Sequence, residues 1–76
     1  MYWDEKLDAI GLLCPLPVLK ARKRLMSMAD GAVLLMLADD SAAIIDVPHF
    51  CVESGHELLR QEAQGGKIKF LIRKQG

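Results

Sequence analysis

The sequence predicts an α/β fold of the α+β kind: a two-layer sandwich in which two helices pack on one face of a four-stranded mixed sheet. The chain has 76 residues, enough for one hydrophobic core. Apolar residues recur every three or four positions in two segments and every second position in others. Glycines and Asp-Gly or Gly-Gly pairs separate these segments. The expected order is βαβαββ, within a single domain covering residues 1–76.

The first two elements are a short strand and a helix. Alternating side chains predict an edge strand over residues 6–10, and Gly11 lets the chain turn after it. A helix is expected over residues 15–28, and the Asp30-Gly31 pair ends it. The apolar stripe of this helix consists of Val18, Ala21, Leu25 and Met28.

The second half of the chain adds a central strand, a helix and a hairpin. The nearly continuous apolar run over residues 32–38 is typical of a strand in the middle of a sheet. A helix is predicted over residues 42–54, with either a kink at Pro48 or two shorter pieces. After Gly55, period-two segments over residues 58–63 and 67–73 flank Gly65-Gly66, which indicates a hairpin.

Composition and charge argue against several classes of function. Ten basic and ten acidic residues cancel, so direct nucleic-acid binding is not expected. The sequence has no apolar stretch of the roughly 18 residues that span a bilayer, so no membrane role is expected. The charged N-terminus and the two cysteines favour a cytoplasmic protein without disulfides. Basic residues still gather at Lys20, Arg22, Lys23 and Arg24, either as a docking patch or as a solvated helix face.

Cys14 is the candidate reactive residue. Pro15 follows it directly, and proline suits the first position of a helix, which places Cys14 at or next to the N-cap. Free N–H groups and the helix dipole should then lower the pKa of the thiol. Thiolate attack on sulfur needs no separate acid or base, because the leaving group is itself a thiolate. The alternative is a small buried hydrophobic residue beside a helix-starting proline.

Several segments resemble one known family. The segment Leu-Asp-Ala-Ile-Gly-Leu-Leu-Cys-Pro-Leu-Pro, residues 7–17, is similar to the signature of the TusA (SirA-like) sulfur-carrier family. Residues 38–40, 46–51, 55–58 and 70–74 also resemble this family, so the likeness covers nearly the whole chain. Leu16 departs from many relatives, which carry a polar or acidic residue at this position.

The resemblance implies a sulfurtransferase that relays sulfur between proteins. Cys14 would accept sulfane sulfur as a persulfide from a cysteine desulfurase and pass it to a downstream acceptor protein, with 2-thiouridine in tRNA as the preferred end product. Molybdenum-cofactor synthesis and oxidative sulfur metabolism remain open as pathways. No cofactor or metal is expected, and the protein is expected to be a monomer. The residues expected to support docking or the thiolate are Pro15, Pro17, Lys20, Arg22 and Lys23.

The remaining candidates have structural interpretations. Cys51 falls on the apolar stripe of the second helix, so it is interpreted as a packed thiol rather than a second sulfur site. His49, Cys51 and His56 lack a recognised metal-ligand spacing. The alternative to a sulfur carrier is a non-catalytic interaction or regulatory module of the same fold.

Overall fold

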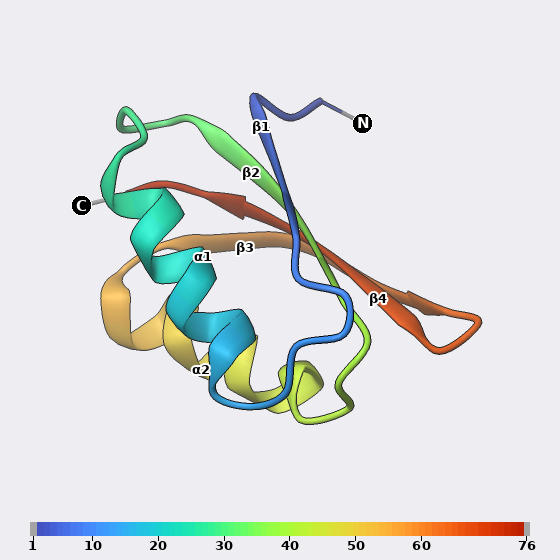
Figure 1. Cartoon of the computed structure of the whole chain (residues 1–76). Coiled ribbons are helices and arrows are strands. Elements are labelled where there is room, and N and C mark those ends of the chain that lie inside the picture. The colour runs from blue at the N-terminus through green and yellow to red at the C-terminus, as the bar shows by residue number, and fades with distance from the viewer. Residues whose placement is uncertain (1, 76) are drawn as a thin grey trace.

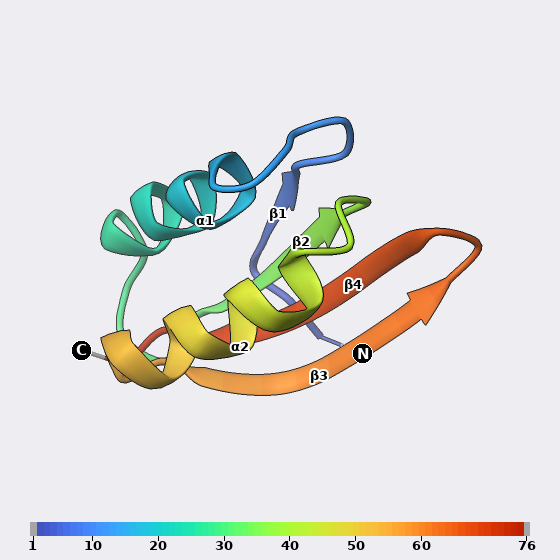
Figure 2. The ribbon, with the colours of Figure 1, turned by 90° about the horizontal axis from the view of Figure 1, so that it is seen from below.

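The computed structural model describes residues 2–75 and confirms the βαβαββ order. The elements are β1 (Glu5–Asp8), α1 (Leu16–Met26), β2 (Val33–Ala38), α2 (Ala43–Ser54), β3 (Glu57–Gln64) and β4 (Lys67–Arg73). Both helices cover the same face of the sheet, as Figures 1 and 2 show. The predicted two-layer α+β arrangement is therefore correct.

The four strands form one mixed sheet in the order β1-β2-β4-β3. β1 runs parallel to β2, with Leu7 opposite Met36. β4 is antiparallel to both β2 and β3, and the Gly65-Gly66 turn joins β3 to β4. Both turn glycines have positive φ, at 58° and 79°, as a tight hairpin turn requires.

The hydrophobic core lies between the helices and the sheet. Its largest fully buried side chains are Phe70, Leu25, Leu34, Met36, Ile72, Val47 and Cys51. Residues Val33, Leu35 and Leu71 form a second, smaller buried cluster apart from this core. β2 contributes to both clusters, which accounts for its nearly continuous apolar sequence.

Most elements differ from the sequence prediction by one or two residues at one or both ends. β1 starts one residue earlier and ends two residues earlier than expected, although the Ala9 N–H still donates to the Leu37 carbonyl at 2.8 Å. α1 ends at Met26, because the next two N–H groups bond three residues back, which tightens the last turn. α2 is one element rather than two pieces, with Pro48 inside it.

Pro48 removes an N–H that would otherwise serve the carbonyl of Ile44. That carbonyl instead accepts a hydrogen bond from Gln61 Nε2 on β3, at 3.4 Å. A side chain from the neighbouring strand thus takes over the hydrogen bond that proline cannot donate, and the helix continues through Pro48.

The parallel pairing of β1 with β2 places two loops side by side. Parallel strands have their carboxyl ends at the same edge of the sheet. The loop that follows β1, residues 9–15, and the loop that follows β2, residues 39–42, therefore meet at one end of the molecule (Figure 1). The first of these loops carries Cys14.

The other end of α1 is fixed by a buried lysine. Lys74 is 8% exposed, and its Nζ donates to the carbonyls of Leu25 at 2.7 Å and Met28 at 3.1 Å. Carbonyls at a helix C-terminus lack intrahelical donors, and a lysine ammonium is a favourable partner for them. The C-terminal segment thus anchors α1 against the sheet.

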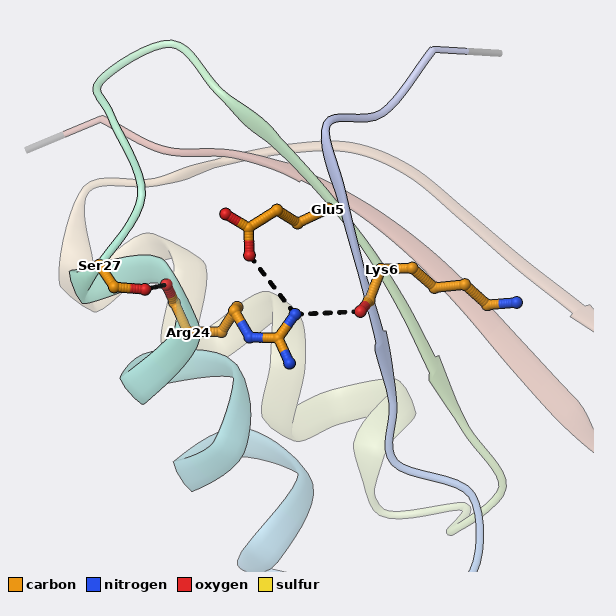
Figure 3. Close-up of polar contacts among 4 residues, drawn as sticks. All are labelled: Glu5, Lys6, Arg24 and Ser27. Atoms are coloured by element: carbon orange, nitrogen blue, oxygen red, sulfur yellow. Dashed lines mark hydrogen bonds and ion pairs between the residues drawn. The ribbon is translucent and has the colours of Figure 1, made fainter.

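Arg24 makes a second connection between α1 and the sheet. Its Nη1 donates to the backbone carbonyl of Lys6 at 3.0 Å and lies 3.4 Å from Glu5 Oε1 (Figure 3). Ser27 Oγ donates to the Arg24 carbonyl at 2.8 Å in the same view. Arg24 therefore ties α1 to β1, and it is not a freely solvated member of the basic run.

Replacing the buried lysine should weaken the fold measurably. Lys74→Met leaves the carbonyls of Leu25 and Met28 without their charged donor, so we expect the free energy of unfolding to fall by about 1 to 3 kcal/mol. Urea denaturation followed by circular dichroism measures the change. Lys67→Met, at an exposed position of β4, is the control and should change the stability little. Equal effects of the two substitutions would show that the buried contacts are not stabilising.

Candidate functional site

Two aspartates of the loop after β2 hold the loop that carries Cys14. The Cys14 N–H donates to Asp40 Oδ2 at 2.6 Å, and the Gly11 N–H donates to Asp39 Oδ1 at 2.9 Å. Asp40 also accepts from the Ala42 N–H at 3.2 Å, next to the start of α2. Cys14 itself is exposed to solvent. The aspartates thus fix the backbone of the loop and leave the thiol accessible.

The start of α1 has fewer free N–H groups than the sequence suggested. Pro15 is the N-cap residue rather than the first helical residue, and Pro17 occupies the first turn. Neither proline has an N–H. The Leu16 N–H donates to the Leu13 carbonyl at 2.8 Å. The Cys14 N–H is already bound to Asp40, so few amide donors remain for a thiolate.

The thiol of Cys14 instead faces a carboxylate. Its Sγ donates to Asp46 Oδ2 of α2 at 3.0 Å. This hydrogen bond raises the pKa of Cys14 above that of a free thiol, and desolvation and the negative charges of Asp46 and Asp40 act in the same direction. The prediction of a lowered pKa is therefore wrong for the free protein, because a carboxylate from a distant segment outweighs the helix terminus.

A shallow hollow between α1 and α2 surrounds the thiol. From α1 and its start it is lined by Cys14, Pro15, Val18, Leu19 and Arg22, and from α2 by Asp46, His49, Phe50 and Glu53. Of the predicted supporting residues, Pro15 and Arg22 thus share the site with Cys14. Pro17 is buried and belongs to the packing of α1. Lys20 and Lys23 border a different hollow, together with Leu16 and Leu19.

Exposed apolar side chains lie close to Cys14 in the chain and beside its partner Asp46. Leu13 is 70% exposed and Leu16 is 46% exposed, on either side of Cys14 and Pro15. Ile45, next to Asp46 on α2, is 74% exposed. Apolar side chains around a reactive group favour contact with another protein. The site is thus an open surface suited to a macromolecular partner.

The other cysteine and the histidines have structural roles. Cys51 is 2% exposed, and burial raises its pKa to about 11. His49 contacts Glu53 one helical turn further along α2, its Nε2 lying 3.1 Å from Oε1. His56 accepts a hydrogen bond at Nδ1 from the Gln75 N–H and packs against Phe50. Among residues 2–75, no group of three or more His, Cys, Asp or Glu side chains is arranged to hold a metal ion.

Asp46 is the site residue that reasoning from the sequence missed. It lies 32 positions from Cys14, so no local spacing connects the two. The available signal was its position in the first turn of a helix that follows the loop of Asp39 and Asp40. That signal indicates favourable interaction with the helix dipole and does not point to a thiol.

No helix within the described part of the chain is both long enough and apolar enough to cross a membrane.

Fold and site together define a small α+β protein that presents one exposed thiol on an open, partly apolar surface. The family model described as "Sulfurtransferase TusA" matches residues 5–74. The chain is 44% identical to the sulfur carrier protein TusA of Allochromatium vinosum over 72 residues, 95% of each chain. The crystal structure of a SirA-like protein from Desulfitobacterium hafniense superposes with a TM-score of 0.81 at 27% identity, covering 92% of this chain and 96% of the other. The chain belongs to the TusA family of sulfur carrier proteins.

The two thiols should differ sharply in chemical reactivity. At pH 8, iodoacetamide should modify the exposed Cys14 and leave the buried Cys51 untouched in the folded protein. Mass spectrometry of the intact protein should therefore show one adduct, and a second only in denaturant. The Cys14→Ser variant should remain unmodified when folded. Labelling of Cys51 in the native state would contradict the assignment.

Proposed function

We propose that the chain carries sulfane sulfur as a persulfide on Cys14. The observation that supports this most is that Cys14 is exposed, at an apolar surface, in a chain of the TusA family, whereas Cys51 is buried in the core. The relative from A. vinosum is itself named a sulfur carrier protein. A thiol that passes sulfur between proteins must be reachable by both of them, and Cys14 meets this condition.

The proposed donor is a cysteine desulfurase that carries a persulfide on its own cysteine. The Cys14 thiol loses its proton to water, and the thiolate attacks the terminal sulfur of the donor persulfide. The new Sγ–S bond forms as the donor S–S bond breaks, and the donor cysteine leaves as a thiolate. No external oxidant or reductant is needed, because the sulfane sulfur moves without a net change in electrons.

The proposed second step returns Cys14 to its initial state. A cysteine of a downstream acceptor protein attacks the terminal sulfur of the Cys14 persulfide, and Cys14 leaves as a thiolate. The proposed end product is 2-thiouridine in tRNA, a preference that the family resemblance alone supports. Equal numbers of basic and acidic residues favour delivery through a protein acceptor over direct contact with tRNA. The carrier is proposed to act as a cytoplasmic monomer.

Loading by a cysteine desulfurase tests the function. After incubation with the enzyme and cysteine, the protein should gain the mass of one sulfur atom, and a thiol reductant should remove it. Cys14→Ser should abolish the gain, and Cys51→Ser, which changes the buried thiol, should retain it. A wild-type protein that gains no mass would favour the non-catalytic interaction module instead.

Charge reversal on α1 tests the proposed docking surface. Arg22 lines the hollow at Cys14, and Lys23 lies on the neighbouring face of the same helix. If the donor presents acidic groups there, Arg22→Glu and Lys23→Glu should each slow loading several-fold, with the larger effect at Arg22. Initial loading rates at low and high salt measure this. Lys67→Glu on β4 is the control for net charge, and an equal loss there would contradict specific docking.

A further inference from the structure

The side chain in contact with the Cys14 sulfur carries a negative charge. Asp46 Oδ2 accepts a hydrogen bond from the Cys14 thiol at 3.0 Å, and Asp40 Oδ2 accepts one from the Cys14 backbone N–H at 2.6 Å. When the thiol ionises, its hydrogen bond to Asp46 is lost and two anions face each other across that distance. Such a site stabilises the thiol and opposes the thiolate.

Other charged groups near the thiol do not remove this effect. Arg22 of α1 and His49 of α2 line the hollow, but His49 contacts Glu53 at 3.1 Å. Within residues 2–75, no basic side chain forms a hydrogen bond with Cys14 Sγ, and Asp46 is its hydrogen-bond partner. Lys20 and Lys23 border a separate hollow. Asp46, the hydrogen-bond partner of the sulfur, therefore has the largest effect on the pKa of the thiol.

This arrangement conflicts with what sulfur loading requires. Attack on a donor persulfide requires the thiolate, yet Asp46 and Asp40 raise the pKa of Cys14 in the free protein. A positive group placed beside Asp46 would pair with the carboxylate and weaken the hydrogen bond that the carboxylate accepts from the thiol. Both the thiol and Ile45, which precedes Asp46, are exposed, so a partner can reach this part of α2.

We propose that Asp46 keeps Cys14 in its protonated, unreactive form in the free carrier, and that a cationic group of the sulfur donor pairs with Asp46 to release the thiolate. This inference rests on the proposed function. On docking, the cation binds the Asp46 carboxylate, the thiol proton passes to water, and the thiolate attacks the donor persulfide as described above. The donor surface would combine this cation with acidic groups opposite Arg22.

The first test compares alkylation of Cys14 across pH in a Cys51→Ser background. With neutral iodoacetamide, Asp46→Asn should react several-fold faster than the parent at pH 7, and the midpoint of its pH–rate profile should move to lower pH. Asp46→Glu keeps the charge and should resemble the parent. Asp30→Asn removes the same charge beyond the opposite end of α1 and should have no effect. An unchanged or raised midpoint in Asp46→Asn overturns the proposal.

The second test uses the parent protein and probes the cation directly. Cystamine, which carries two ammonium groups, and dithiodipropionate, which carries two carboxylates, each form a mixed disulfide with Cys14 and release one thiol. Cystamine also has the better leaving group, so the informative quantity is the ratio of the two rates: it should be larger in the parent than in Asp46→Asn and unchanged in Asp30→Asn. A parent that reacts equally fast with both reagents, or faster with the anionic one, overturns the proposal even if no variant folds.

Neither assay contains a desulfurase, so the role of Asp46 is tested independently of the proposed sulfur-carrier function. If the shifted pH profile and the cystamine preference are observed while loading fails, the role of Asp46 in setting thiol reactivity stands and the sulfur-carrier function is lost. If loading succeeds with an unshifted profile, Cys14 carries sulfur and Asp46 does not control it.

Discussion

The parallel pairing of β1 with β2 is the constraint on which the site depends. Leu7 lies opposite Met36, and this register brings the carboxyl ends of the two strands to the same edge of the sheet. Two loops far apart in the sequence then touch, and Asp39 and Asp40 bind the backbone of the loop that carries the cysteine. α2 starts directly after this contact, which places Asp46 against the thiol. A change of register between these strands would therefore separate every pair of contacting groups at the site.

The fold could be predicted from the sequence because its signals are local. The apolar run of β2, the glycine pair of the hairpin and the stripe on α1 each lie within a short window. The position of Cys14 before a proline-started helix was also visible, but the pKa of its thiol was not. Pro15 and Pro17 carry no N–H, and the hydrogen bond that raises the pKa is donated by the thiol to Asp46, 32 positions away. Local pattern pointed to Cys14 as the candidate residue, whereas tertiary contacts determine the direction in which the pKa of its thiol is shifted.

The surroundings of the basic residues on α1 also depend on tertiary contacts that the sequence alone does not reveal. Four positive residues within one helix looked like a single patch, yet the fold gives them different surroundings. Arg24 turns back to the β1 backbone, Arg22 faces the hollow at the thiol, and Lys20 and Lys23 border another surface. Helical spacing gives the direction of a side chain only relative to its own axis, and the neighbours of the helix decide whether that side chain is structural or available to a partner.

The order of segments along the chain has a consequence for newly made protein. Residue 14 leaves the ribosome before residues 39–46, which supply both carboxylates that contact it. Until β2 and α2 have been synthesised and have folded onto the N-terminal segment, the nascent cysteine lacks its restraining partners and behaves as an ordinary thiol. Once the sheet is complete, small oxidants and electrophiles in the cell meet a thiol whose pKa is raised, and which therefore forms less of the reactive thiolate.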